Sequence, residues 1–297
     1  MAHESFENNE TAKIMNEKFI NIKVDREERP DLDFIFQRSL SILTGTQGGW
    51  PLSMFLDENG VPFTGGTYFP PTALYGRPSF TEVLENVSKI YFENRDKIIS
   101  QKSQMEIVFK DLNKKNAILK QSLEPFVEKI LQYLDNENGG FKGSPKFPHF
   151  YMFDTIYYFY EKNKNEKFLK PVEKLLENIS SRGIYDHLEG GISRYTVDEK
   201  WIIPHFEKML YDNVQYVNLL SQYINSKENS NLKSKLIQTI NFINREFITK
   251  EYLLGSAYDA DSDGIEGKYY IWKYDQIKKI IGEDINLFKV KYNISEN

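Results

Sequence analysis

Residues 44–63 read TGTQGGWPLSMFLDENGVPF, and this stretch decides the fold of the first part of the chain. Its glycines interrupt the helical pattern before it, and an apolar run follows Trp50-Pro51 and ends at Asn59-Gly60. An Asn-Gly pair between two apolar segments is a strong signal for the tight turn of a β-hairpin. The stretch therefore predicts two antiparallel strands after Pro51. The glycines that lead into Trp50-Pro51 are also compatible with a cis peptide bond there.

The segments around this stretch change between helical and strand patterns over short distances. Residues 9–18 have a helical composition, residues 19–24 alternate like a strand, and Pro30 suits the first position of a further helix. Residues 79–116 are lysine-rich and helical. We therefore expect a mixed α/β domain that ends near residue 118.

The later part of the chain has aromatic-rich helical segments with few strand signals. The expected helices cover residues 123–134, 150–161, 168–181, 204–225, 232–247 and 274–281. Glycine-containing loops at Gly140, Gly191 and Gly255 separate pairs of them. This pattern is typical of stacked helical hairpins, each of which buries its apolar face against the next.

Composition excludes several classes of protein. The 297 residues carry 38 Lys+Arg against 43 Asp+Glu, a net charge of −5, so we expect no nucleic-acid partner. No run approaches the about 20 apolar residues of a membrane span, and the first residues do not read as a signal peptide, so we expect a cytoplasmic protein without membrane contact. Because the chain has no cysteine, thiol chemistry and thiolate zinc sites are excluded for it. We expect no metal and no cofactor.

The densest group of chemically active side chains lies in residues 185–213, YDHLEGGISRYTVDEKWIIPHFEKMLYDN. If Pro204 opens a helix, four side chains share one face at i, i+3, i+4 and i+7: His205, Lys208, Met209 and Asp212. Imidazole, ammonium and carboxylate on one face are typical of a cleft, and a helix start would favour a neutral His205 as general base. A structural polar network that ties hairpins together explains the same residues.

Two further patterns leave alternatives open. Residues 259–264, DADSDG, begin like a calcium loop, but Tyr270 stands where a bidentate Glu belongs. What remains is a carboxylate cluster that is either solvated or faces a polar pocket. The aromatic run in residues 150–160 suits a sugar-stacking wall or, more simply, a helix core.

Five motifs, in this order, resemble one family: HESFENNETAKIMNEKFINIKVDREERPDLD, TGTQGGWPLSMFLDENGVPFTGGTYFPP, GGFKGSPKFP, GGISRYTVDEKWIIPHFEKMLYDN and SAYDADSDGIEGKYYIW. They are similar to the thioredoxin-domain family of spermatogenesis-associated protein 20 and its bacterial relatives, over essentially the whole chain. The resemblance implies an α/β thioredoxin-like domain, residues 1–118, followed by an all-α toroid. Residues 119–297 would be the first half of an (α/α)6 toroid of the six-hairpin type, similar to N-acylglucosamine 2-epimerases and six-hairpin glycosidases.

The resemblance also assigns positions in the first domain. Residues 19–24 would form a central strand, and Trp50 with Pro51 would form the cis-proline site of a thioredoxin-like fold. Family members carry a CHWCH-type segment directly before the residues that match Met1, and they continue beyond Asn297. We therefore expect this chain to be a fragment that lacks both motif cysteines and is redox-inactive.

Similarity to epimerases and glycosidases implies carbohydrate chemistry in the toroid. The candidate catalytic residues are His205, Glu207, Asp212, His187 and Asp186. The candidate substrate-binding residues are Arg194, Tyr195, Trp201, Lys208, Asp259 and Asp261. The alternative is a non-catalytic scaffold that docks a protein partner through its thioredoxin-like domain, so the expected partner is a small carbohydrate or another protein. Convergence of the charged residues on an open pocket would favour carbohydrate chemistry, and scattered, salt-bridged positions would favour the scaffold.

Overall fold

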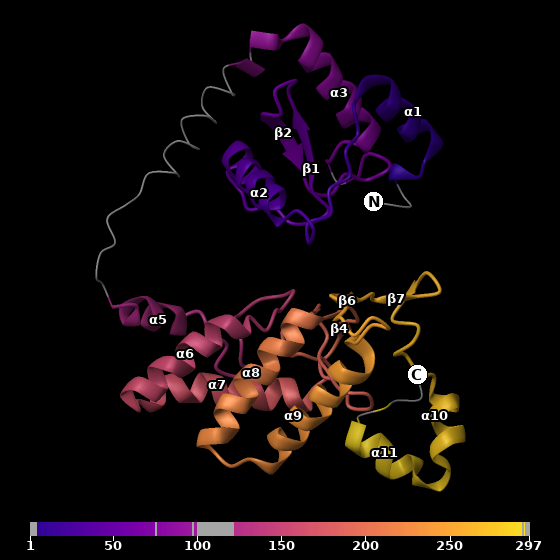
Figure 1. The fold of residues 1–297 in the computed structure, drawn as a ribbon. Helices are drawn as coiled ribbons and strands as arrows, with labels where there is room; N and C mark the ends of the chain where they lie inside the picture. Colours follow the sequence, from indigo (N-terminus) through magenta and orange to yellow (C-terminus); the bar gives the residue numbers. More distant parts are fainter. Residues whose placement is uncertain (1–4, 75, 97, 100–121, 293, 295–297) are drawn as a thin grey trace. The chain divides into compact units, whose positions relative to one another are not determined.

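The computed structural model of the chain divides into two compact units, Met1–Leu119 and Lys120–Asn297. It describes residues 5–74, 76–96, 98–99, 122–292 and 294 (Figure 1). None of the described helices is long and apolar enough to cross a membrane.

The first unit combines helices with one small sheet. The elements are α1 (Asn9–Lys18), α2 (Pro30–Thr44), β1 (Ser53–Leu56), β2 (Pro62–Gly66) and α3 (Phe80–Glu93). The side chain of Asn8 caps α1 by accepting from the backbone N–H groups of Glu10 and Thr11. The helix expected at residues 9–18 and the helix start at Pro30 are both confirmed.

The hairpin that the sequence predicts is present. Strands β1 and β2 pair antiparallel, with Ser53 opposite Gly66. In the turn, Asp57 Oδ1 accepts from the backbone N–H of Asn59 at 2.9 Å and of Val61 at 2.8 Å. The Trp50-Pro51 peptide is cis, as the glycine-rich approach allowed, and a second cis bond at Ser144-Pro145 was not expected.

The strand expected at residues 19–24 is wrong for the described structure. The segment has no regular secondary structure, and the described sheet of this unit contains only β1 and β2. Phe19 packs toward β1, with its ring 5.7 Å from that of Phe55, whereas Ile20 and Ile22 are 94% and 81% exposed. An alternating pattern sets an extended backbone, but a strand also needs a neighbour within hydrogen-bonding distance.

The second unit is built from helices in consecutive hairpins (Figure 1). They are α5 (Glu124–Leu131), α6 (Phe150–Asn163), α7 (Glu166–Ser181), α8 (Leu210–Ser226), α9 (Ser230–Phe242), α10 (Tyr274–Ile281) and α11 (Ile285–Tyr292). Helix α6 packs on α7 and α8 packs on α9, while α6 also contacts α8 and α7 contacts α9. These stacked pairs agree with the expected toroid type of fold. The aromatic run of α6 forms core: Phe150, Phe153, Tyr157, Phe159 and Tyr160 are buried.

Two glycine loops have the same construction, which supports the repeat seen in the sequence. Leu134 bridges to Phe141 around the first loop, and Tyr185 bridges to Ile192 around the second. In each, an aspartate side chain accepts from the two backbone N–H groups two and three residues later. Asp135 does so at 2.9 and 2.9 Å, and Asp186 at 3.0 and 3.0 Å.

A buried lysine braces each of these loops. Lys146 Nζ lies 2.7 Å from Asp135 Oδ2, and Lys208 Nζ lies 2.7 Å from Asp186 Oδ2, with 1% and 2% of the two lysine side chains exposed. Lys146 also donates to the Glu199 carbonyl at 2.9 Å. Since an unpaired buried charge is costly, these pairs fix the loops that lead into α6 and α8.

The helix expected from Pro204 is wrong over its first turns, because α8 begins only at Leu210. The preceding residues form short antiparallel pairs: β3 (Tyr195–Thr196) with β4 (Pro204–His205), and β5 (Lys208–Met209) with β6 (Ala257–Tyr258). Proline is compatible with an edge strand as well as with a first helical position. The helical face that was to unite His205, Lys208, Met209 and Asp212 therefore does not exist.

The acidic stretch that resembled a calcium loop is a hairpin. Strand β7 (Asp261–Ser262) pairs with β8 (Ile265–Glu266). The two residues between them, Asp263 and Gly264, have φ values of 52° and 72°. Two positive φ values at an Asp-Gly pair are the signature of a type I′ turn.

Candidate functional site

Three chain segments meet where the loops enter α6 and α8. Lys146 pairs with Thr196 through backbone bonds of 2.8 and 3.0 Å, and Tyr195 lies opposite His205 in the β3–β4 pair. Strands β4, β6 and β7 gather at one end of the helices of this unit (Figure 1). The side chains next to these pairings are thereby brought close together.

A row of three rings crosses these segments. The Phe147 and Tyr195 rings are 4.6 Å apart, and the Tyr195 and His205 rings are 4.7 Å apart and only 17° from parallel. All three side chains are partly exposed. The row therefore offers ring edges, one phenol and one imidazole to solvent.

A charged cluster lies beside the row. Arg194 Nη1 donates to Glu207 Oε2 at 2.8 Å, and the two side chains are 23% and 25% exposed. Asp212 stands in the first turn of α8, and its Oδ2 is buried with no hydrogen-bond partner. Burial raises the pKa of Asp212 to about 7; Glu207 adds to this rise and Arg194 opposes it. A carboxyl with such a pKa exchanges its proton near neutral pH.

Tyr195 connects the rings to the charges. Burial raises the pKa of its phenol; the charges of Glu266 and Glu207 raise this pKa further, and the charge of Arg194 lowers it. The phenol therefore lies within the electric field of all three charged groups. We call Phe147, Arg194, Tyr195, His205, Glu207 and Asp212 together the loop-end site.

Two of the sequence candidates form a structural ion pair instead. Besides its bond to Asp186, Lys208 donates to the Gly190 carbonyl at 3.0 Å and lies 4.4 Å from the centre of the Phe242 ring. Burial lowers the pKa of Lys208, and the Asp186 carboxylate counteracts this. All of these contacts lie within the protein, so we do not place Asp186 and Lys208 in the loop-end site.

The remaining candidates are also elsewhere. His187 lies against α9, with Nε2 3.0 Å from the Arg182 carbonyl and Nδ1 3.3 Å from Nζ of Lys235, and burial lowers its pKa. Trp201 is fully buried and donates to the Asn138 carbonyl. Asp259 and Asp261 are exposed at the β6–β7 connection.

Sequence reasoning missed two residues of this region. Phe147 follows the buried Lys146 in the loop before α6, and Glu266 reaches His205 from β8 at 2.7 Å. The pattern SPKFPHF at residues 144–150 was a signal for a fixed loop. The approach of Glu266 depends on a contact between residues 61 positions apart, which no local pattern shows.

No group of three or more His, Asp or Glu side chains that could hold a metal ion occurs within the described ranges. In the first unit, Trp50 is 51% exposed. Its indole N–H donates to Asp33 Oδ1 at 2.8 Å, and the Arg26 guanidinium lies 3.9 Å from the ring centre. The ring beside the cis peptide is thus held in place while much of it stays accessible.

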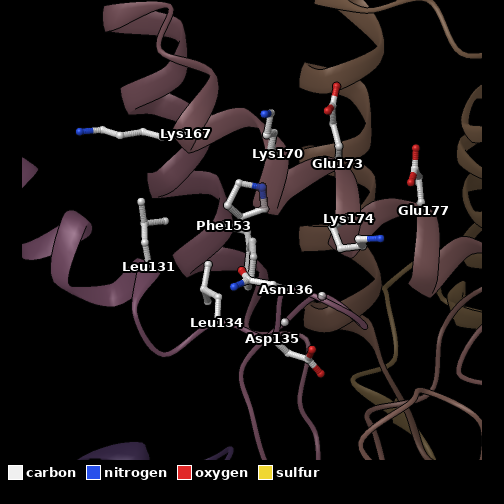
Figure 2. Close-up of a pocket in the computed structure, with 13 residues that line it drawn as sticks. Leu131, Leu134, Asp135, Asn136, Phe153, Lys167, Lys170, Glu173, Lys174 and Glu177 are labelled. Atoms are coloured by element: carbon white, nitrogen blue, oxygen red, sulfur yellow. The ribbon is translucent and has the colours of Figure 1, made fainter.

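A hollow of about 540 Å³ lies between α5, the Asp135 loop and α7, and none of the six residues of the loop-end site lines it (Figure 2). Its apolar floor includes Leu131 and Phe153, and its rim carries Lys167, Glu173 and Glu177 of α7. Figure 2 shows the long charged side chains of α7 extending away from this floor. Mixed charges on an open rim give no convergent group for one ligand, so we assign no function to the hollow.

Comparisons with known proteins follow the two units. Residues 1–110 match the family described as Thioredox_DsbH, protein of unknown function DUF255. An uncharacterized protein of Caenorhabditis elegans is 34% identical over 302 residues, which cover 95% of this chain and 41% of that protein. Spermatogenesis-associated protein 20 of Homo sapiens is 29% identical over 302 residues, with 96% and 38% covered.

The chain thus spans about two-fifths of the length of these curated relatives. Among solved structures, a sugar epimerase from a ruminal bacterium aligns with a TM-score of 0.41 and 17% identity, over 49% of this chain and 42% of that one. The resemblance drawn from the sequence motifs is confirmed: residues 1–110 match the DsbH thioredoxin-like family, and the chain is similar to spermatogenesis-associated protein 20 over nearly all of its residues.

Proposed function

We propose that the helical unit binds a small carbohydrate at the loop-end site. The observation that carries this proposal is the buried, unpartnered Oδ2 of Asp212. A buried polar atom without a partner costs about 1–3 kcal/mol, so such atoms call for an explanation. A ligand hydroxyl would supply the missing hydrogen bond.

The surroundings of Asp212 suit the same class of ligand. Sugars present both apolar C–H faces and many hydroxyls. The Phe147–Tyr195–His205 row supplies apolar edges with polar tips, and Arg194 and Glu207 supply a donor and an acceptor at a distance of 2.8 Å from each other. A mostly apolar surface with a few placed polar groups is the usual composition of a small-molecule site.

Asp212 and His205 are the two groups of this site suited to proton transfer. A general acid or base works best when its pKa is near the working pH, and burial places that of Asp212 at about 7. His205 is an imidazole with only 26% of its side chain exposed. Proton transfer at a carbon or an oxygen of a bound sugar is the chemistry that this pair supports best.

The test is ligand-observed saturation-transfer NMR with a panel of neutral and N-acetylated monosaccharides. The wild-type chain should transfer saturation to at least one sugar, and Tyr195→Ala should abolish the transfer. Tyr158→Ala is the matched control, since Tyr158 is a 60% exposed tyrosine on α6 outside the site. Equal signals from the Tyr195 and Tyr158 variants, or none from the wild type, would contradict the proposal.

The alternative function is the docking of a protein through the thioredoxin-like unit. The observation that favours it is the half-exposed Trp50, fixed by Asp33 and Arg26. Aromatic residues held in one conformation are frequent anchors of protein interfaces. A peptide array probed with the wild-type chain and with Trp50→Ala tests this function: peptides that bind both equally would argue against it.

This chain contains no cysteine, so it has no thiol for disulfide exchange. In the presence of dithiothreitol, the chain should therefore not increase the rate of insulin reduction above the rate with dithiothreitol alone. A faster reduction would show redox chemistry that this account does not contain.

A further inference from the structure

We infer that Glu266 is a positioning residue for His205: it holds the imidazole with Nδ1 protonated, so that Nε2 is the free nitrogen at the loop-end site. Only the statement that a ligand contacts this nitrogen rests on the function proposed above. The arrangement of the two side chains is independent of the ligand.

The contact itself selects one tautomer. His205 Nδ1 and Glu266 Oε1 are 2.7 Å apart. An ionised carboxylate only accepts hydrogen bonds, so Nδ1 must carry the hydrogen. In the neutral ring the lone pair then lies on Nε2, and the partner of one ring nitrogen thereby sets the chemistry of the other.

The ring is also fixed from its face. Tyr195 lies 4.7 Å from His205 and 17° from parallel, which prevents the imidazole from tilting freely. Glu266 holds the edge of the ring and Tyr195 holds its face. Two contacts in different directions leave little freedom to a side chain that has only two rotatable bonds.

The hairpin that carries Glu266 is itself fixed beside His205. A side chain at Gly267 would overlap the ring of Phe206, the residue after His205, so the backbone of Gly267 lies directly against that ring. The Phe206 ring stacks on Tyr270 at 5.2 Å and 7°. Gly267 also donates to the Ala260 carbonyl at 2.9 Å, which closes the base of the hairpin. Glu266 is therefore presented to His205 by a packed element, although its side chain is 55% exposed.

The test reads the tautomer directly by nitrogen NMR on protein labelled with ¹⁵N-histidine. The chain has four histidines, and the signals lost in His205→Gln identify those of His205. At pH 8.5 the wild type should show a protonated Nδ1 and a bare Nε2, the tautomer that the contact with Glu266 selects. Glu266→Gln keeps an acceptor oxygen and should preserve this pattern, whereas Glu266→Ala should give a mixture of the two tautomers.

A matched control lies on the same hairpin. Asp263→Asn removes an 80% exposed charge that pairs with Lys268, and asparagine tolerates the positive φ of this turn position, so the nitrogen spectrum of the variant should equal that of the wild type. A wild-type ring protonated at Nε2, or an unchanged His205 spectrum in Glu266→Ala, would overturn the inference. Since Glu266→Gln retains the contact, it also separates a positioning effect from a general loss of the hairpin.

Ligand binding gives the second readout. For a sugar that binds the wild type, Glu266→Ala should weaken the affinity about ten-fold, because it removes the charge-assisted hydrogen bond that orients His205. Glu266→Gln should weaken the affinity much less. Equal affinities of the wild type and Glu266→Ala would overturn a role of the contact in binding. If no sugar binds the wild type, the proposed function fails, and the nitrogen spectra still decide whether Glu266 positions His205.

Discussion

Arg194 and Glu207 are joined twice, by a side-chain bond of 2.8 Å and by a bond of 2.9 Å from the backbone N–H of Arg194 to the Glu207 carbonyl. The double connection fixes the guanidinium and the carboxylate next to each other. Asp212, the second carboxyl of the cluster, keeps a buried oxygen without a hydrogen-bond partner. The loop-end site thus combines a hydrogen-bonded ion pair with a carboxyl group that lacks a hydrogen-bond partner on one oxygen.

Asp212→Asn should remove part of the pH dependence of stability. Burial raises the pKa of Asp212 from 3.8 to about 7, so between these values the folded protein holds a proton that the unfolded chain has released. The contribution of this group is therefore full below pH 4, falls as the pH rises toward 7 and is constant above. Asparagine resembles the protonated acid and avoids this loss. The variant should gain up to a few kcal/mol on the wild type, at about 1.4 kcal/mol for each pH unit.

Urea unfolding at several pH values from 4 to 8 measures this difference. Asp275→Asn is the control, because Asp275 is an exposed aspartate in the first turn of α10. The account would be contradicted by a wild type and an Asp212→Asn variant whose stabilities run parallel across this range.

Lys208→Met should destabilise the helical unit by about 3–5 kcal/mol, because it leaves the Asp186 carboxylate buried without its partner. Adding Asp186→Asn should recover part of the loss, since the uncompensated charge is then gone. The exposed Lys268–Asp263 pair is the control, and Lys268→Met should change stability by less than about 1 kcal/mol. Urea unfolding of the wild type and the three variants forms the comparison, and a Lys208→Met loss no larger than that of Lys268→Met would contradict the bracing role.

Gly140→Ala should destabilise the protein more than Gly264→Ala, although the two glycines have similar φ angles. Their φ values are 76° and 72°, so the strain of a left-handed alanine is about 1–2 kcal/mol in each. A Cβ at Gly140 would also lie 2.6 Å from Trp201 Cζ2, whereas at Gly264 it meets nothing within 4 Å. We expect an additional loss of about 1–3 kcal/mol for Gly140→Ala from this overlap. Equal melting temperatures for the two variants would show that the loop can move away from Trp201.

Local chemistry predicted the parts of the fold that are fixed locally. Residues 57–60 make the hairpin turn through the Asp57 side chain, and Pro30 opens α2 at the position that its fixed φ suits. The helix at residues 9–18 and the hairpins of the second unit followed from composition and periodicity. These features depend on residues that are close neighbours in the sequence.

The predictions that failed concern features that depend on contacts between residues far apart in the sequence. Residues 19–24 have the pattern of a strand and lack a partner in the described structure, and residues 204–209 pair with β3 and β6 instead of starting a helix. Arg194, Glu207 and Asp212 were grouped because they lie within one motif. Phe147 and Glu266 could not be grouped with them, since loops brought together by tertiary packing place them there.

The most direct measurement of the central claim is calorimetric titration of the sugar that gives the strongest NMR response. The wild type and Tyr158→Ala should bind it with the same affinity. Tyr195→Ala and Asp212→Ala should each bind at least about ten-fold more weakly, because they remove a ring and the unpaired carboxyl from the loop-end site. Wild-type affinity in both of these variants would contradict the claim that the loop-end site is where the carbohydrate binds.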